Sequence, residues 1–452
     1  MKLFQQMLVA GASMSLIAPI AAQASDVVNL EEIDSYTRSQ TKSSKIDSNT
    51  FINEINEDIA TLNARVDGLE VMQNEFEAGG FSDTTVMTGK VVFDIGAVDG
   101  ATVPVVTAQP ITATSTLNAA GDAVTTDITE NDPTTADVPA EAVGFQYTYQ
   151  INLNTSFTGD DDLYVRLKSG NATDIFSNKT QGTYLSSSNG NDDAVKVDKV
   201  WYSFLVGEKH RFWVGPRIEN YYMHGASPSI YKPITKQFKL GGNGAAYGAS
   251  TNSGVGWAYN ADNGFSISSN VVSKQNGTNL GFLTDEAETN WSTQVAYTTP
   301  KFHVSYISAA KYNGWEDSYY TTTLGKDRPG GDSTNHGLRA YWRPDDSGSA
   351  MPEISAGYDI STVEGQDADT DAFFVGLTWK DSFQADDKIG IAFGQPQTAD
   401  SDPVDPFAWE AYYSFKINDS VSMTPAIFGS SDRTGNELED VTGYVLQTTF
   451  KF

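Results

Sequence analysis

The feature that most constrains this chain is an alternation of apolar and polar side chains with a period of two, which recurs from residue 84 to residue 452. Successive side chains of a β-strand point to opposite faces, so the pattern predicts strands with one apolar and one polar face. Leu338 and Trp342, for example, fall on one face, and Arg339 and Arg343 on the other. About sixteen strands are expected, at residues 84–96, 143–157, 162–169, 194–206, 210–217, 253–260, 264–273, 289–298, 301–311, 336–343, 352–361, 370–380, 387–395, 406–417, 420–430 and 440–452.

The connections between these strands alternate in length. Short links occur at residues 207–210, 262–263 and 418–419, and long ones at 97–142, 170–193, 218–252 and 312–335. Tight turns at one end and long loops at the other are typical of outer-membrane barrels, and an even strand count closes the sheet without free edges. The expected fold is therefore all-β: a transmembrane antiparallel β-barrel of about 16 strands over residues 84–452.

The N-terminus has the pattern of an export signal. Lys2 is followed by an apolar core over residues 7–20 and by a small-residue cleavage motif at residues 22–24. This arrangement predicts a cleaved signal peptide at residues 1–24. Residues 25–50 are polar and are expected to form a flexible linker. Export followed by an even-stranded barrel predicts an outer-membrane location, with membrane lipid as one partner.

Residues 51–79 carry a heptad pattern that predicts a periplasmic coiled-coil helix ahead of the barrel. An isolated helix of this length is marginal in water, so the apolar seam needs partners. Residues 65–70 resemble a short trimer-specifying pattern, which implies a homotrimer. The alternative is an amphipathic helix that docks on its own barrel. The residues assigned to the seam and to its flanking ion pair are Ile52, Ile55, Ile59, Leu62, Arg65, Val66, Leu69 and Glu70.

The C-terminus alternates strictly and ends on an aromatic residue. Phe450 and Phe452 occupy alternate positions of the last expected strand. Such an ending resembles the C-terminal assembly signal of outer-membrane barrels.

Composition and motifs argue against several function classes. The chain has 29 Lys and Arg against 58 Asp and Glu, a net charge of −29, which disfavours nucleic acid as a partner. It has no Cys, and its four His show no metal-ligand spacing, so neither a metal nor a cofactor is expected. His224 and Ser227 lie close in sequence and could suggest a base and a nucleophile, but no third residue is present to orient them. We therefore expect that the protein is not an enzyme. Residues 160–162, three consecutive Asp, are expected to form a solvated turn rather than a calcium loop.

Several short motifs together resemble the cyanobacterial outer-membrane porins of the iron-uptake group, which are related to the carbohydrate-selective OprB-like porins. The motifs lie at residues 65–70, 86–98, 200–204, 212–216, 338–344, 393–397, 408–410, 423–428 and 448–452. The resemblance implies a trimeric barrel that passes small hydrophilic solutes, including inorganic ions, iron species and sugars. Such porins usually carry an S-layer-homology domain before the coil. Only residues 25–50 occupy that place here, which leaves anchoring to peptidoglycan open.

Charge is distributed unevenly along the expected barrel. The connection at 97–142 has seven acidic residues and no Lys or Arg, whereas residues 211–239 contain one acid, Glu219. In many trimeric porins the third long loop folds into the lumen, where a basic lining would favour anions. The alternative is ordinary solvated lysines paired with acids of the outer loops. The candidate constriction residues are Arg211, Arg217, Lys232, Lys236 and Lys239, with Arg166, Lys168, Arg339 and Arg343 on inward positions of other strands.

Three tyrosines in the same connection allow two interpretations. Tyr221, Tyr222 and Tyr231 either stack on sugar rings or pack the loop against the wall. The overall prediction is a passive diffusion porin with a possible anion preference. One rival is a structural outer-membrane protein with a plugged barrel that links to the periplasm through its coil. Another is a soluble secreted β-sandwich, whose strands would alternate in the same way.

Overall fold

The computed structural model describes residues 84–107, 112–117, 123–129, 134–139, 142–172, 174–179, 182–242, 246–248, 250–274, 281–315, 331–345, 351–365, 369–432 and 440–452. The expected signal peptide (1–24), linker (25–50) and coiled-coil helix (51–79) lie outside the described residues. No helix within these ranges is both long and apolar enough to cross a membrane.

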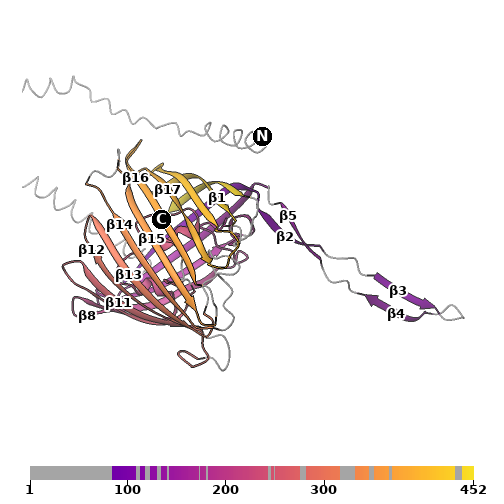
Figure 1. Cartoon of the computed structure of the whole chain (residues 1–452), viewed down its shortest axis with the longest axis horizontal. Coiled ribbons are helices and arrows are strands. Elements are labelled where there is room, and N and C mark those ends of the chain that lie inside the picture. The colour runs from indigo at the N-terminus through magenta and orange to yellow at the C-terminus, as the bar shows by residue number, and fades with distance from the viewer. Residues whose placement is uncertain are drawn as a thin grey trace, which may run out of the picture. The chain divides into compact units, whose positions relative to one another are not determined.

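Sixteen antiparallel strands form a closed barrel, in which each strand pairs with its neighbours in sequence and β1 pairs with β20 (Figure 1). The barrel strands are β1 (Thr85–Asp99), β6 (Gly144–Thr155), β7 (Asp162–Gly170), β8 (Lys196–Val206), β9 (His210–Ile218), β10 (Asn252–Asn260), β11 (Phe265–Ser273), β12 (Thr289–Thr298), β13 (Phe302–Tyr312), β14 (Ser333–Trp342), β15 (Glu353–Val363), β16 (Thr370–Lys380), β17 (Lys388–Ala399), β18 (Phe407–Lys416), β19 (Val421–Ser431) and β20 (Val441–Lys451).

Each expected strand corresponds to one barrel strand, which confirms the predicted fold class. The largest difference is at β17, which continues to Ala399 instead of ending at residue 395. Connection lengths alternate as predicted over most of the barrel. One exception is the connection between β14 and β15, at residues 343–352. It was expected to be a short turn, but it is longer than the next connection, at residues 364–369.

The connection at 97–142 was expected to be a loop, and this was wrong in part. It contains β2 (Thr102–Thr107), β3 (Thr112–Leu117), β4 (Ala123–Thr129) and β5 (Thr134–Pro139). Strand β2 pairs with β5, and β3 pairs with β4, as two separate two-stranded sheets (Figure 1). The many Thr and Val of this segment favour extended backbone.

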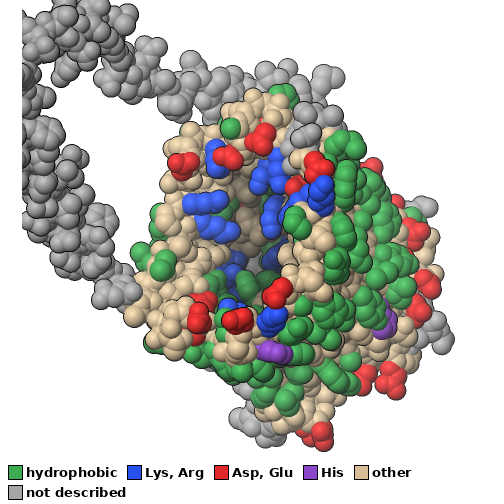
Figure 2. Space-filling view, turned by 90° about the vertical axis from the view of Figure 1, so that its left-hand side faces the viewer, with side chains coloured by type: hydrophobic (Ala, Val, Ile, Leu, Met, Phe, Trp, Pro, Cys, Tyr) green, Lys and Arg blue, Asp and Glu red, His purple; other side chains and the backbone are tan. Residues whose placement is uncertain are grey.

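The barrel wall has its apolar face outside and its polar face inside. The outward residues Trp291, Val304 and Leu338 are more than half exposed, whereas the inward residues Ser292 and Asn335 are fully buried. Figure 2 shows hydrophobic side chains spread over the outer wall. A soluble sandwich would place the apolar face inside, so this arrangement is that of a membrane barrel with a polar lumen.

Two long connections fold into this lumen and carry the short helices η1 (Asp174–Phe176), η2 (Asn220–Met223) and η3 (Lys236–Gly241). We call residues 219–251 the inner loop and residues 171–195 the neighbouring loop. Phe176 and Leu185 of the neighbouring loop pack with Ile234 of the inner loop in one buried apolar cluster. The same cluster includes Phe374 of β16 and Phe428 of β19, so the two loops are packed against the inner wall.

The three consecutive Asp at 160–162 lie where the short connection from β6 enters β7, but the predicted solvated turn was wrong in part: Asp160 is exposed, whereas Asp161 is buried. The carboxylate of Asp161 accepts hydrogen bonds from the backbone N–H groups of Phe157 and Thr158, at 2.8 Å each, and from the hydroxyl of Tyr202 at 2.7 Å. The residue therefore caps a turn.

Candidate functional site

The inner loop runs across the lumen and is hydrogen-bonded to the inner wall along its length. Near its start, Asn220 donates to the side chain of Asn270 on β11 at 2.7 Å. Further along, the backbone N–H of Ala226 donates to Gln294 on β12 at 3.2 Å. These contacts fix the first half of the loop against β11 and β12.

The middle of the inner loop is held by a buried carboxylate. Glu410 on β18 is fully buried, and its oxygens accept from the backbone N–H of Ile234 at 3.0 Å and of Thr235 at 2.7 Å. The hydroxyls of Thr235 and Tyr231 also donate to it, at 2.5 and 2.9 Å. Since Lys236 follows Thr235 directly, this anchor positions a basic residue of the loop.

A second anchor lies a few residues later. The guanidinium of Arg339 on β14 donates to the carbonyl of Leu240 at 3.0 Å and to both oxygens of Asp359 on β15, at 2.9 and 2.8 Å. The loop approaches β15 so closely that a Cβ on Gly357 would lie 1.9 Å from the carbonyl oxygen of Gly241. The segment that carries Lys236 and Lys239 is therefore fixed at both ends.

The neighbouring loop pairs with the inner loop inside the barrel. Leu185 and Thr235 form an antiparallel bridge, and the backbone N–H of Ser186 donates to the carbonyl of Ile234 at 2.7 Å. On the other side of the bridge, the N–H of Lys236 donates to the carbonyl of Tyr184 at 2.8 Å. The two loops thus narrow the lumen together.

A cavity of about 430 Å³ lies beside the paired loops, and we call it the first cavity. Its five basic residues come from β1, β7 and the inner loop, against two acids, Asp198 and Glu219. Figure 2 shows Lys and Arg side chains gathered around the hollow of the molecule. The basic lining residues are Lys90, Arg166, Lys168, Lys236 and Lys239.

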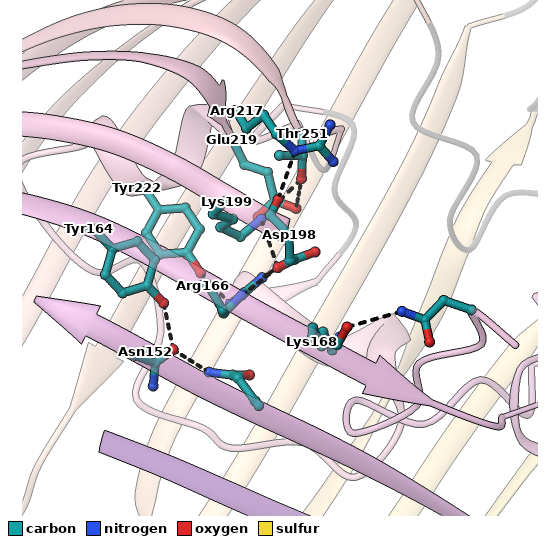
Figure 3. Close-up of polar contacts among 12 residues, drawn as sticks. Asn152, Tyr164, Arg166, Lys168, Asp198, Lys199, Arg217, Glu219, Tyr222 and Thr251 are labelled. Atoms are coloured by element: carbon teal, nitrogen blue, oxygen red, sulfur yellow. Dashed lines mark hydrogen bonds and ion pairs between the residues drawn. The ribbon is translucent and has the colours of Figure 1, made fainter. Parts of the chain in front are cut away.

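Both acids of the first cavity are already paired (Figure 3). Asp198 forms an ion pair with Arg166, and Glu219 forms one with the buried Lys199 at 2.9 Å. Glu219 also accepts from the hydroxyl of Thr251 at 3.1 Å. Arg166 in addition donates to the hydroxyl of Tyr222 at 3.1 Å.

The loop residues of the first cavity have shifted pKa values. Burial lowers the pKa of Lys236 well below its usual range, and the neighbouring charges of Lys239 and Lys168 lower it further. Burial alone would raise the pKa of Glu219, but Lys199 and Lys239 outweigh it, and the pKa falls to about 2. Lys236 also lies over the ring of Tyr184, at 4.2 Å from its centre. Burial therefore makes the charged form of Lys236 less favourable, while Glu219 stays ionised; the excess of basic over acidic groups rests on the five basic and two acidic lining residues.

A second cavity, of about 310 Å³, lies between another part of the inner loop and β14–β18. Its basic residues again outnumber its one acid, Glu353, which pairs with Lys380 at 2.6 Å and with Arg343 at 3.5 Å. The basic lining residues are Lys232, Arg343, Lys380 and Lys388.

The structure brings together six of the nine constriction candidates, in two groups. Arg166, Lys168, Lys236 and Lys239 line the first cavity, and Lys232 and Arg343 line the second. The other three line neither. Arg211 donates to Ser203 at 3.1 Å, Arg217 is exposed with its Nε 3.4 Å from the carbonyl of Asp198, and Arg339 is enclosed as the loop anchor.

Sequence reasoning missed Lys90, Lys380 and Lys388, which also line the cavities. All three lie on strands and not in the basic stretch of the chain. The strand alternation could have identified them, because alternate residues of a strand share a face. Lys380 lies on the same face as the buried Thr378, and Lys388 on the same face as the buried Ala392.

The contacts of Tyr231 and of His224 indicate structural roles for both residues. Tyr231 is buried and bonded to Glu410, so it packs the loop against the wall, whereas Tyr221 lines the first cavity. Burial lowers the pKa of His224 to about 3. Its ring lies against Ser268, and Ser227 donates to the carbonyl of Ser229, so the two are not hydrogen-bonded to each other. Among the described residues, no three His, Asp or Glu side chains gather as a metal site.

Comparisons with known proteins agree with this architecture. An uncharacterized protein of Nostoc sp. is 27% identical over 455 aligned positions, which cover 88% of this chain and 71% of that protein. The solved structure of OprB from Pseudomonas putida has a TM-score of 0.52 at 10% identity, covering 82% of this chain and 94% of that one. An anion-selective porin from Comamonas acidovorans has a TM-score of 0.50 at 12% identity, covering 82% and 99%. At these identities the solved structures show a shared fold.

The family comparison is more specific. The model of the carbohydrate-selective porin family, OprB, matches residues 44–452, which include all barrel strands. This chain therefore belongs to the OprB family of carbohydrate-selective porins and is an outer-membrane β-barrel porin.

Proposed function

We propose that this porin conducts small hydrophilic solutes by passive diffusion with a preference for anions. The observation that carries the proposal is the excess of basic residues in both cavities beside the inner loop. The whole chain has a net charge of −29, so this positive lining runs against its overall composition. In a narrow channel with a low-dielectric wall, such a lining attracts anions and repels cations more strongly than the same charges would in bulk water.

The remaining functional expectations are part of the same proposal. Small sugars are candidate solutes because the family is carbohydrate-selective, and the polar lumen suits them. Iron species stay a candidate on the resemblance alone. We further propose that the chain is exported through a cleaved signal peptide at 1–24, and that it forms a homotrimer assisted by the helix at 51–79.

Reversal potentials under a KCl gradient test the anion preference. Replacing Lys168, Lys236 and Lys239 with Gln removes three positive charges from the first cavity and should shift the reversal potential toward cation preference. The control Arg217→Gln removes one positive charge from an exposed residue that lines neither cavity, so it should shift the reversal potential by much less than a third of the triple variant's shift. An unchanged reversal potential in the triple variant would mean that ions do not pass the first cavity.

A plugged barrel with a structural role is the second candidate. The observation that favours it is the apolar cluster that joins both loops to the inner wall, which is the packing expected of a fixed plug. Single-channel recordings in planar bilayers separate the two functions. Discrete openings of the purified trimer support the porin, and their absence in correctly folded protein supports the plug.

A further inference from the structure

We propose that the first cavity is a saturable binding site for dianionic phosphoryl groups. This inference rests on the proposed anion-conducting function and names a ligand class for it. A general anion preference needs only an average positive potential. A site also needs several cationic donors that converge on one enclosed volume and polar groups that can complete the coordination.

The cationic donors are held in place by the two anchors. Glu410 fixes the backbone directly before Lys236, and Arg339 fixes the carbonyl of Leu240 directly after Lys239. Lys168 reaches the same cavity from β7. The backbone on both sides is hydrogen-bonded, and the ammonium groups donate to tyrosine hydroxyls, Lys236 to Tyr184 at 3.1 Å and Lys239 to Tyr221 at 3.4 Å. This arrangement lowers the ordering entropy that binding costs.

The charge balance of the cavity favours a ligand with more than one negative charge. Both lining carboxylates are engaged, Asp198 with Arg166 and Glu219 with Lys199. Burial is the main cause of the lowered pKa of Lys236, and the positive charges of Lys239 and Lys168 lower it further, so these three lysines are close enough to repel one another. A dianion would relieve the repulsion between several of them at once, whereas chloride relieves only part of it.

The cavity also offers neutral hydrogen-bond donors. The hydroxyl oxygen of Ser186 and the amide nitrogen of Asn189 are enclosed at its edge and have no hydrogen-bond partner in the described part of the chain. Enclosed donors without partners are costly, and phosphoryl oxygens are strong acceptors that would satisfy them. The lining is otherwise polar, with Leu240 its one aliphatic residue.

The cavity has a volume of about 430 Å³ and a water occupies roughly 30 Å³, so a phosphoryl group fits together with several waters or an attached sugar ring. Either free phosphate or a phosphorylated sugar could therefore supply the phosphoryl group. For the sugar phosphate, Tyr221 at the wall provides an aromatic surface near the lysines.

Single-channel chloride currents of the full chain in a planar bilayer test the site. Inorganic phosphate, glucose 6-phosphate and glucose are added in turn at about pH 7.5, where a phosphate monoester is mostly dianionic. Both phosphates should reduce the current in a saturable manner, and glucose at equal concentration should not. A stronger effect of glucose 6-phosphate than of phosphate would identify the sugar phosphate as the better ligand.

Variants then locate the binding site. Lys236→Gln with Lys239→Gln should raise the half-blocking phosphate concentration about tenfold or more. A tenfold change corresponds to a loss of roughly 1.4 kcal/mol of binding free energy. Arg in place of both lysines keeps the charge and should retain the block. The equal charge change Lys380→Gln with Lys388→Gln, in the second cavity, should leave the block in place.

The proposal is overturned if the channel conducts chloride but phosphate does not block it. It is also overturned if the block persists in the Lys236 and Lys239 double Gln variant. Failure of the proposed function gives a different result, because no discrete openings or no anion preference would then be seen before phosphate is added.

Discussion

The carboxylate of Glu410, on β18, accepts hydrogen bonds from both the backbone N–H and the hydroxyl of Thr235, which lies on the inner loop. The two residues are far apart in sequence, and their contact decides where Lys236 stands in the lumen. A carboxylate suits this place because all four groups that reach it are donors, from Tyr231, Ile234 and Thr235.

Glu410→Gln should loosen the inner loop. An amide offers one acceptor oxygen and brings two donors of its own, so buried donors of the loop would lose partners at a cost of about 1–3 kcal/mol each. We expect noisier single-channel currents and a lower unfolding temperature in detergent. Glu288→Gln disturbs an ion pair with Lys274 in the connection between β11 and β12, outside the contacts of Glu410, and is the control. Wild-type current noise in Glu410→Gln would show that the loop is held by its apolar packing alone.

Arg339→Met should destabilise the barrel by about 3–5 kcal/mol, because it leaves the carboxylate of Asp359 buried without its partner. Arg339→Met combined with Asp359→Leu removes both charges and should recover much of this loss. Urea unfolding of the detergent-solubilised protein measures both variants. If the double variant were as unstable as the single one, the role of Arg339 would lie in its bond to Leu240 rather than in the ion pair.

The anion preference should decrease as the pH rises, and should do so below the ordinary lysine pKa of 10.5. Burial lowers the pKa of Lys236 and of Lys239, so both lose their positive charge at a lower pH than exposed lysines do. Glu219, with a pKa of about 2, stays charged throughout and does not contribute to the change.

Reversal potentials between pH 6 and pH 10 measure this titration. Arg at positions 236 and 239 stays protonated over the whole range and should keep the preference constant. If the anion preference of the Arg variant decreased with pH as much as that of the natural chain, groups other than these two lysines would be responsible for the decrease.

Deleting Phe452 should impair insertion into the outer membrane. Its backbone closes the barrel seam, since Phe452 and Gly89 exchange two hydrogen bonds of 2.7 and 3.1 Å between β20 and β1. Outer-membrane levels of the truncated chain measure the effect. Phe452→Leu keeps the backbone bonds and tests the ring separately. Normal levels of the truncated chain would contradict the predicted role of the terminus as an assembly signal.

The helix expected at 51–79 should contribute to trimer formation. Ile59→Asp with Leu62→Asp places charges on its apolar seam and should lower the heat resistance of the trimer on gels. Thr61→Asp with Ala64→Asp adds the same charges off the seam and serves as the control. A trimer of normal heat resistance in the seam variant would mean that the barrel walls alone hold it together.

The sequence by itself determined the barrel. Period-two alternation depends on local side-chain order, so it indicated each strand and divided its residues into two faces, as at Leu338 and Arg339; the structure showed that the apolar face is the outer one. The number of alternating segments indicated sixteen strands, and this even count predicted the closure of β1 on β20; the alternating connection lengths indicated a membrane barrel. The family did not follow from the alternation: short motifs along residues 65–452 carried the resemblance, and the family model that matches residues 44–452 confirmed it.

Only the tertiary structure decided which basic residues meet. By strict alternation Arg217 should lie on the same face of β9 as the buried Trp213. The register of β9 shifts near Val200 of β8 and near Asn252 of β10. Arg217 is therefore exposed, and Ile218 is buried in its place. A bulge of this kind exchanges the two faces of a strand, and alternation in one sequence does not reveal it. The position of Lys236 likewise depends on Glu410, a contact between distant segments that exists only once the barrel has closed around the inner loop.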